Sequence, residues 1–199
     1  MILTNIKLRN SLKKIVRATK SIDDILLFGS IIRGKQNPQD IDIMILFKEK
    51  VDKATEYKIR KELEKYAKNI SIVSKTQKTA IEQTFDARES ILFECISLLS
   101  GKNLAKEYGF SSLGMLKYKI KGWTNLQKTQ FYHALNGRSG KGGVLEQLSS
   151  IKLSDNIILT PLNRIELMKD FLDFWKIEYL YIPLLIPHRM NHKNILEEL

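Results

Sequence analysis

The sequence predicts a protein of the α+β or α/β class, in which a small mixed sheet flanked by helices is followed by a smaller, basic α+β domain. Three observations support this prediction. Short apolar segments alternate with segments of helical periodicity, as they do where strands and helices pack in layers. Glycine and serine interrupt this pattern between residues 101 and 114, which indicates a boundary. The 199 residues are enough for two small domains, which we expect at 1–105 and 106–199.

The first domain is expected to alternate helices and strands. Its first helix, residues 5–19, spaces apolar side chains at near-helical intervals and places lysine and arginine between them. The segment DIDIMILF, residues 40–47, alternates polar and apolar residues and then becomes apolar throughout, as a mostly covered strand does. The other expected elements are a strand at 24–28, a helix at 51–68, a strand at 69–74 and a buried helix at 87–99.

The second domain is distinguished by its charge. Between residues 101 and 150, eight lysines and arginines are opposed by only two glutamates. A helix at 127–135 is followed by the segment LNGRSGKGGVL, residues 135–145, whose four glycines indicate a flexible, cationic loop. Such a loop either contacts a sugar-phosphate backbone or is only a mobile connector. The closing elements are expected as a strand at 156–161, a helix at 162–176 and a strand at 177–186.

The composition limits the class of partner and the compartment. The formal net charge of +11 favours polyanionic partners such as nucleic acid or nucleotides, although a charge that only keeps the protein soluble is the alternative. Cys95 is the single cysteine, which excludes an intramolecular disulfide and suits a reducing compartment. The longest apolar run is interrupted by Pro183 and Pro187 and is too short to span a bilayer. We therefore expect a soluble, cytoplasmic protein with no membrane partner.

The candidate catalytic residues lie in FGSIIRGKQNPQDIDIMILF, residues 28–47. Successive side chains of a strand point to opposite faces, so Asp40 and Asp42 share one face. Mg²⁺ prefers carboxylate and phosphate oxygens and water, and a pair of such ions can activate an attacking hydroxyl. Asp40 and Asp42 are thus the predicted catalytic residues and ligands of Mg²⁺ or Mn²⁺.

A phosphate-binding turn is expected directly before these aspartates. Gly29 lets backbone N–H groups approach a phosphate, the Ser30 hydroxyl can bond a phosphate oxygen, and a helix expected next would point its positive end there. Arg33 and Lys35 would add countercharge. Together these four residues form the predicted nucleotide-binding set.

The arrangement resembles the GSxxRG and DxD pattern shared by DNA polymerase beta, CCA-adding enzymes, poly(A) polymerases and small prokaryotic nucleotidyltransferases. The resemblance covers roughly the first 100 residues, and the whole chain is similar to small archaeal proteins that carry this domain. It implies a polymerase-beta-like nucleotidyltransferase fold, a nucleoside triphosphate substrate and a divalent metal. The positions that carry it are Gly29, Ser30, Arg33, Gly34, Asp40 and Asp42.

One position departs from the pattern of this superfamily. Active members usually place a third carboxylate on the strand after the DxD strand, and Ser71 is the residue that aligns with it. A serine hydroxyl is a poor Mg²⁺ ligand and no useful base at neutral pH. Glu82, Asp86 or Glu94 could approach from the following segment, although each is more typical of a solvated helix face or a cap. Catalytic competence is therefore left open at this point.

The basic second domain contains the predicted nucleic-acid contacts. Aromatic side chains at Tyr118, Trp123 and Tyr132, with Phe131 and His133, are interleaved with lysines and either stack on bases or form a small core. We expect only one or two of them to be exposed. The predicted phosphate-contacting cations are Lys117, Lys119, Lys121, Arg138 and Lys141.

Three functions agree with these features. The first is a metal-dependent nucleotidyltransferase that moves a nucleoside monophosphate to a hydroxyl, with RNA, such as a tRNA-like end, as acceptor. The second is an RNA-binding protein that keeps this fold with weakened catalysis, as Ser71 would allow. The third resembles the antitoxin-like or protein-modifying nucleotidyltransferases, whose acceptor is a protein side chain. The concentrated basic charge argues against the third, and the sequence leaves the oligomeric state unknown.

Overall fold

A computed structural model of the protein describes residues 2–138 and 140–190, and the chain divides into two compact units. The first unit comprises Met1–Ile32 and Gln36–Tyr108. The second comprises Gly109–Leu199 together with the short segment Arg33–Lys35. A segment of the GSxxRG turn therefore belongs to the second unit by its contacts, although it lies within the first unit in sequence.

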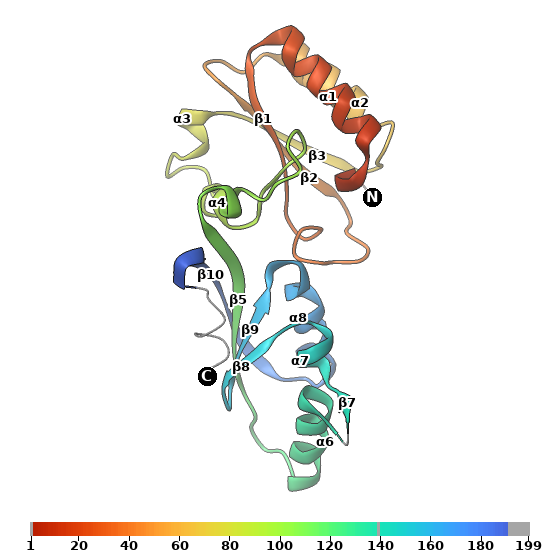
Figure 1. Ribbon diagram of the computed structural model, residues 1–199, viewed down its shortest axis with the longest axis vertical. Coiled ribbons are helices and arrows are strands. Elements are labelled where there is room, and N and C mark those ends of the chain that lie inside the picture. The colour runs from red at the N-terminus through yellow and green to blue at the C-terminus, as the bar shows by residue number, and fades with distance from the viewer. Residues whose placement is uncertain (1, 139, 191–199) are drawn as a thin grey trace. The chain divides into compact units, whose positions relative to one another are not determined.

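The first unit is a four-stranded mixed sheet with helices on both faces (Figure 1). Its strand order is β3-β2-β1-β4, in which β2 and β3 are parallel and the other neighbours are antiparallel. The elements are η1 (Ile2–Thr4), α1 (Ile6–Thr19), β1 (Ile22–Phe28), β2 (Ile41–Phe47), α2 (Lys53–Leu63), β3 (Ile70–Thr76), α3 (Gln77–Ala80), α4 (Arg88–Glu94), β4 (Ile96–Ser97) and α5 (Leu104–Glu107).

Two hydrophobic layers enclose this sheet. Helices α1 and α2 lie side by side over one face (Figure 1) and bury Leu8, Leu12, Ile59 and Leu63. Each helix begins with a side-chain cap, and in α1 the Asn5 side chain accepts the Leu8 N–H at 3.0 Å. On the opposite face a smaller cluster contains the fully buried side chains of Leu26, Met44 and Cys95.

The expected mixed sheet with flanking helices is confirmed, with two corrections at element ends. Helix α2 ends at Leu63, five residues before the end of the predicted helix at 51–68. The predicted helix at 87–99 is only α4, which stops at Glu94, because Cys95 is extended and Ser97 pairs with Leu26 in the sheet. A fully buried apolar run has no amphipathic period, so helix and strand cannot be distinguished there from the sequence pattern.

The second unit is an antiparallel sheet in the order β10-β5-β9-β8. Its main elements follow the sequence β-α-β-β-α-β with this strand order, which is the split βαβ or ferredoxin-like arrangement. A short hairpin and helix are inserted after the first helix. The elements are β5 (Phe110–Lys119), α6 (Asn125–Asn136), β6 (Gly137–Arg138), β7 (Lys141–Gly142), α7 (Val144–Gln147), β8 (Ile151–Ser154), β9 (Ile157–Pro161), η2 (Leu162–Arg164), α8 (Ile165–Phe174), β10 (Glu178–Pro187) and η3 (His188–Met190).

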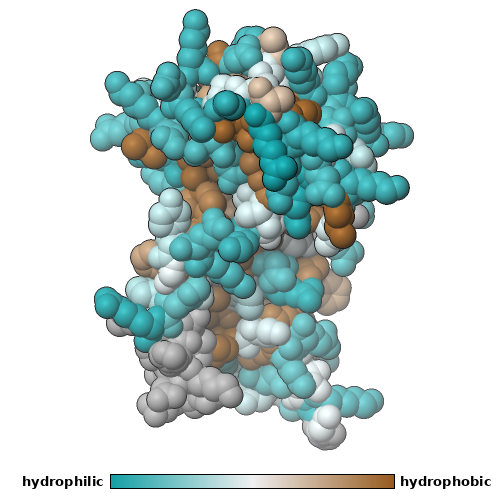
Figure 2. Space-filling view, turned by 45° about the horizontal axis from the view of Figure 1, so that its top comes forward, coloured by the Kyte–Doolittle hydropathy of each residue, from teal (hydrophilic) through white to brown (hydrophobic). Residues whose placement is uncertain are grey.

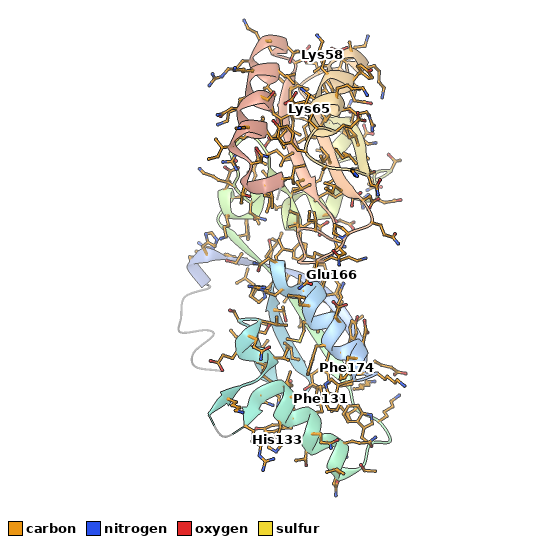
Figure 3. The ribbon with its side chains drawn as sticks, turned by 90° about the vertical axis from the view of Figure 1, so that its right-hand side faces the viewer. Lys58, Lys65, Phe131, His133, Glu166 and Phe174 are labelled. Atoms are coloured by element: carbon orange, nitrogen blue, oxygen red, sulfur yellow. The ribbon has the colours of Figure 1, made fainter. Side chains whose placement is uncertain are left out.

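Helices α6 and α8 pack on one face of this sheet through an aromatic core (Figure 3). The Phe131 ring of α6 stacks on Phe171 of α8 with their centroids 5.8 Å apart, and Tyr118 of β5 meets Phe131 edge-on. Leu116 and Ile158, which pair across β5 and β9, complete the strand side of the core. Residues two apart on these strands point to the same face, so Lys117 and Lys119 occupy the other face of the sheet.

Candidate active site

Asp42 lies where the ends of three strands meet. It is the second residue of β2, it pairs with Phe28, the last residue of β1, and its neighbour on β3 is Ser71. Asp42 is half-buried, whereas Asp40 precedes the strand and is exposed. The two predicted carboxylates thus come from the start of β2, beside the end of β1.

The turn after β1 lies directly against Asp42. Gly29 has a φ of +83°, and a Cβ atom placed on it would be 2.3 Å from Oδ2 of Asp42. The Gly29 carbonyl accepts the Ile32 N–H at 3.1 Å, which closes the turn. Only glycine suits this position, because it both adopts the left-handed conformation and leaves room for the carboxylate.

The helix predicted after Gly29 and Ser30 is wrong. Residues 29–40 are all described and none of them is helical, since the chain turns and bends back to enter β2 antiparallel to β1. Gly34, with a φ of +96°, and Pro38 lie in this segment and do not favour a helix. A helix dipole therefore does not contribute to anion binding at this turn.

The Gly29 N–H is engaged by a carboxylate of the protein. Oε1 of Glu94 accepts it at 3.0 Å in a buried hydrogen bond, and Glu94 is only 2% exposed. The expectation of a solvated face or cap is therefore wrong for Glu94, whereas Glu82 and Asp86 are exposed. One indication in the sequence that Glu94 is buried is its position inside the apolar run ILFECI, because a charged residue within a buried pattern needs a polar partner.

Negative charge and burial act together near this carboxylate. Burial raises the pKa of the Cys95 thiol well above its ordinary range, and the charges of Glu94 and Asp24 raise it further. Burial also raises the pKa of Asp24, although the Ser97 hydroxyl opposes this by donating a hydrogen bond at 2.8 Å. Cys95 is thus a protonated, buried thiol and not a nucleophile.

Arg33 is ion-paired within the second unit. Its Nε donates to Oε1 of Glu166 at 2.8 Å, and the Glu166 N–H donates to the Arg33 carbonyl at 3.0 Å. Figure 3 places Glu166 at the start of α8. Burial alone would raise the pKa of Glu166, but the hydrogen bond from Arg33 and the charge of Lys169 lower it. A phosphate contact by Arg33 would have to coexist with this pair, whereas Lys35 is exposed.

The position of the usual third carboxylate is occupied by serine. Ser71 is paired with Asp42 in the parallel register, so their side chains leave the same face of the sheet. Within residues 2–138 and 140–190, no group of three or more His, Cys, Asp or Glu side chains is arranged to hold a metal ion. Among these described residues, Asp40 and Asp42 are therefore not joined by a third ligand of that kind.

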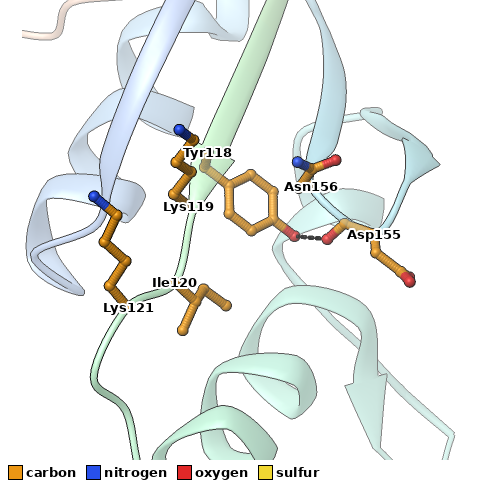
Figure 4. A pocket seen from close by; sticks show the side chains of 6 residues that line it. All are labelled: Tyr118, Lys119, Ile120, Lys121, Asp155 and Asn156. Carbon is orange, nitrogen blue, oxygen red and sulfur yellow. Dashed lines mark hydrogen bonds between the residues drawn. The ribbon is translucent and has the colours of Figure 1, made fainter.

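The predicted nucleic-acid cations occur in two places. Lys117 and Lys119 are exposed on the sheet face that α6 and α8 leave uncovered, and Lys121 follows the strand. An open hollow of about 320 Å³ is lined by Lys119, Lys121, Tyr118 and Asn156, among others (Figure 4). The second group is the hairpin in which Arg138 and Lys141 pair.

The segment 135–145, expected as a flexible, cationic loop, contains regular secondary structure. The segment contains the end of α6, the strand pair β6–β7 and the start of α7. Gly137 has no room for a side chain, since an added Cβ would lie 2.2 Å from the Lys141 carbonyl oxygen. The glycines therefore permit close backbone packing, and both Arg138 and Lys141 are exposed.

Most of the aromatic residues considered for base stacking belong to the core. Tyr118 and Phe131 are buried, and Trp123 packs edge-on against Phe131 at 5.7 Å. The Tyr118 hydroxyl donates to the Asp155 carbonyl at 2.7 Å (Figure 4). Tyr132 is the aromatic of this set that is clearly exposed, at 54%, which agrees with the expectation that only one or two are accessible.

The first unit has the mixed sheet with flanking helices that is expected of a nucleotidyltransferase domain. Residues 10–95 match the family described as Polymerase beta, Nucleotidyltransferase. Residues 10–95 therefore form a nucleotidyltransferase domain of the DNA polymerase beta superfamily, a fold that implies a nucleotide substrate. No match was found among curated proteins or among solved structures. None of the described helices is long and apolar enough to cross a membrane.

Proposed function

We propose that this protein is a metal-dependent nucleotidyltransferase that transfers a nucleoside monophosphate from a nucleoside triphosphate to a hydroxyl, with RNA as the acceptor. The observation that supports this best is the closeness of the Gly29 turn to Asp42, because it brings the GSxxRG segment and the DxD segment together at one end of β1 and β2. The family match covers both segments. Cytoplasmic localisation is part of the proposal, since the single, buried thiol suits a reducing compartment.

The residues of the site suit a metal shared with the substrate. Mg²⁺ is commonly held by one or two carboxylates together with substrate phosphates and water, and Asp40 and Asp42 supply that number. When bound, such an ion would supply countercharge to the triphosphate and acidify the attacking hydroxyl. Ser30, next to the Gly29 turn, is the proposed hydroxyl donor to a phosphate oxygen.

The proposed reaction forms one bond and breaks another at the α-phosphorus. The acceptor oxygen bonds to this phosphorus, the bond to the β-phosphate oxygen breaks, and pyrophosphate leaves with the electron pair. The hydroxyl proton passes to water, because Ser71 is no base at neutral pH. Asp40 and Asp42 would hold a divalent cation, without which two carboxylates repel the triphosphate. Most of the catalysis then comes from positioning and charge.

The site assignment can be tested with a double substitution. Replacing Asp40 and Asp42 by alanine should abolish divalent-dependent triphosphate binding and leave the fold intact or more stable, because two neighbouring like charges repel without a cation. The matched control replaces Glu82 and Asp86 by alanine. Both are exposed in the same unit, and their replacement removes the same charge. Equal calorimetric affinity for Mg²⁺ and nucleotide in the double alanine variant and the wild type would reject the site.

RNA as acceptor is supported by the exposed lysines of the second unit. A single-stranded RNA that contacts them should lose affinity with salt at a slope of about 0.7 per phosphate contact. Replacing Lys117 and Lys119 by alanine should flatten this slope for many sequences alike, because backbone contacts carry no sequence information. Lys58 and Lys65, exposed in the first unit (Figure 3), form the control pair. If the Lys117/Lys119 variant and the Lys58/Lys65 variant show the same salt dependence of RNA affinity, the proposed surface is contradicted.

A second candidate is an RNA-binding protein that has kept the fold and lost turnover. Its specific support is the serine beside Asp42, where active relatives carry a carboxylate. The two candidates differ in metal-dependent turnover. Incubation with each labelled triphosphate, Mg²⁺ or Mn²⁺, and total cellular RNA would decide between them: labelled RNA supports the transferase, RNA binding without label supports the second candidate, and labelled protein would support a protein acceptor.

A further inference from the structure

A buried carboxylate stands behind the proposed site. Glu94 is the last residue of α4 and is 2% exposed, and its Oε1 accepts the Gly29 N–H at 3.0 Å although the two residues are 65 positions apart in sequence. Burying a carboxylate is costly unless hydrogen bonds compensate it. This bond therefore fixes α4 to the turn and gives the amide of Gly29 a defined direction.

The same glycine also lies close to Asp42. The position of a Cβ on Gly29 is 2.3 Å from Oδ2 and 3.3 Å from Cβ of Asp42, so the carboxylate lies against the backbone of the turn. Glu94 and Asp42 thus both lie close to Gly29. A shift of the turn would release or displace the Asp42 carboxylate, because close-packed groups transmit displacement.

We propose that Glu94 is a positioning residue of the transfer site, which holds the Gly29 turn so that Asp42 keeps one side-chain conformation. This inference rests on the proposed function. It also restricts how phosphate is bound: the Gly29 N–H is committed to Glu94, so the phosphate contacts come from Ser30 and the residues after it. A carboxylate fits this task because a charged acceptor makes a stronger hydrogen bond to a backbone N–H than a neutral acceptor does.

Two substitutions separate the hydrogen bond from the charge. Glu94→Gln keeps a carbonyl oxygen that can accept the Gly29 N–H, whereas Glu94→Met has similar volume and no comparable acceptor, so a large cavity is avoided in both. Glu89, which is exposed on the same helix, is the control when changed to glutamine and to methionine. The measurements are calorimetric affinity for nucleotide with Mg²⁺, Gly29 amide exchange, and the Asp42 side-chain rotamer from scalar couplings.

The expected result is a graded loss. Glu94→Met should weaken nucleotide binding by about ten-fold or more, consistent with loss of a charged hydrogen bond, and should speed Gly29 exchange and average the Asp42 rotamer. Glu94→Gln should stay within about three-fold of the wild type, because a neutral acceptor retains part of the bond. The two Glu89 variants should match the wild type in all three measurements.

Three outcomes would overturn the inference. If Glu94→Gln binds nucleotide as poorly as Glu94→Met while Gly29 remains protected, the charge itself is required and Glu94 is not a positioning residue. If Glu94→Met frees the Gly29 amide and leaves nucleotide affinity and the Asp42 rotamer unchanged, the bond is only a structural link to α4. If the wild type binds no nucleotide, the proposed function fails separately, and an unchanged Asp42 rotamer in Glu94→Met would still reject the positioning role.

Discussion

Substitution of Gly29 by alanine tests the contact on which the site is built. The left-handed conformation, with φ of +83°, costs an alanine about 1–2 kcal/mol. In a domain of about 100 residues this corresponds to a fall in melting temperature of roughly 4–16 °C. The new Cβ would also lie 2.3 Å from Oδ2 of Asp42, where real contacts are essentially never shorter than 3.0 Å.

The consequence for the site is a displaced carboxylate. Asp42 is the flexible partner in this contact, so it must retreat by about 0.7 Å or more. Misplacement of a catalytic group by about 1 Å can cost about 100-fold in rate. We expect Gly29→Ala to lower Mg²⁺-dependent nucleotide binding, measured by calorimetry, and transfer, measured with labelled triphosphate, by about 10- to 100-fold.

Gly109→Ala provides the matched control. Gly109 has a φ of +79°, and nothing lies within 4 Å of an added Cβ. The two substitutions therefore introduce similar backbone strain, and only the one at Gly29 displaces Asp42. If both variants lose stability and both keep wild-type nucleotide affinity below their melting temperatures, the reasoning about the site is refuted.

The remaining predictions concern Ser71, Glu166 and Tyr118. Ser71→Asp adds a carboxylate beside Asp42, so it should lower stability without divalent ions, restore it with Mg²⁺ and raise transfer above the wild type. A fall in activity would show either that Ser71 does not face the reaction or that another acid already fills this position. The pKa of Glu166 is lowered in the folded state, so its contribution to the free energy of unfolding is present above its unfolded pKa and is lost as pH falls through the folded pKa. Glu166→Gln should therefore reduce the acid-induced loss of stability by about 1–2 kcal/mol, measured by thermal unfolding at a series of pH values, and an unchanged loss would exclude the pair with Arg33 as its cause. Burial raises the pKa of Tyr118 to about 12, so its contribution to stability is present below the unfolded pKa and is lost as pH rises towards 12. Tyr118→Phe should remove this loss of stability at alkaline pH in unfolding scans, and should remove one tyrosinate transition from the absorbance titration.

Strand β5 shows why part of the second unit could not be predicted. Its sequence contains Gly114 and two serines, which indicated a boundary and not a strand. In the fold, Gly114 is required because an added Cβ would lie 2.9 Å from both Ile165 and Tyr181. The glycine marks the close approach of a helix and a neighbouring strand, and those two residues lie more than 50 positions further along the chain.

The sequence by itself determined the features that depend on neighbouring residues. The alternation in residues 40–47 predicted β2, and the spacing from Gly29 to Asp42 predicted a turn beside Asp42, because strand period and turn chemistry are local properties. Tertiary structure alone decided the partners of this turn. Glu94 lies 65 positions from Gly29, and Glu166 lies 133 positions from Arg33. Whether a charged side chain is solvated, paired or buried depends on which distant segment packs against it, and no local pattern contains that information.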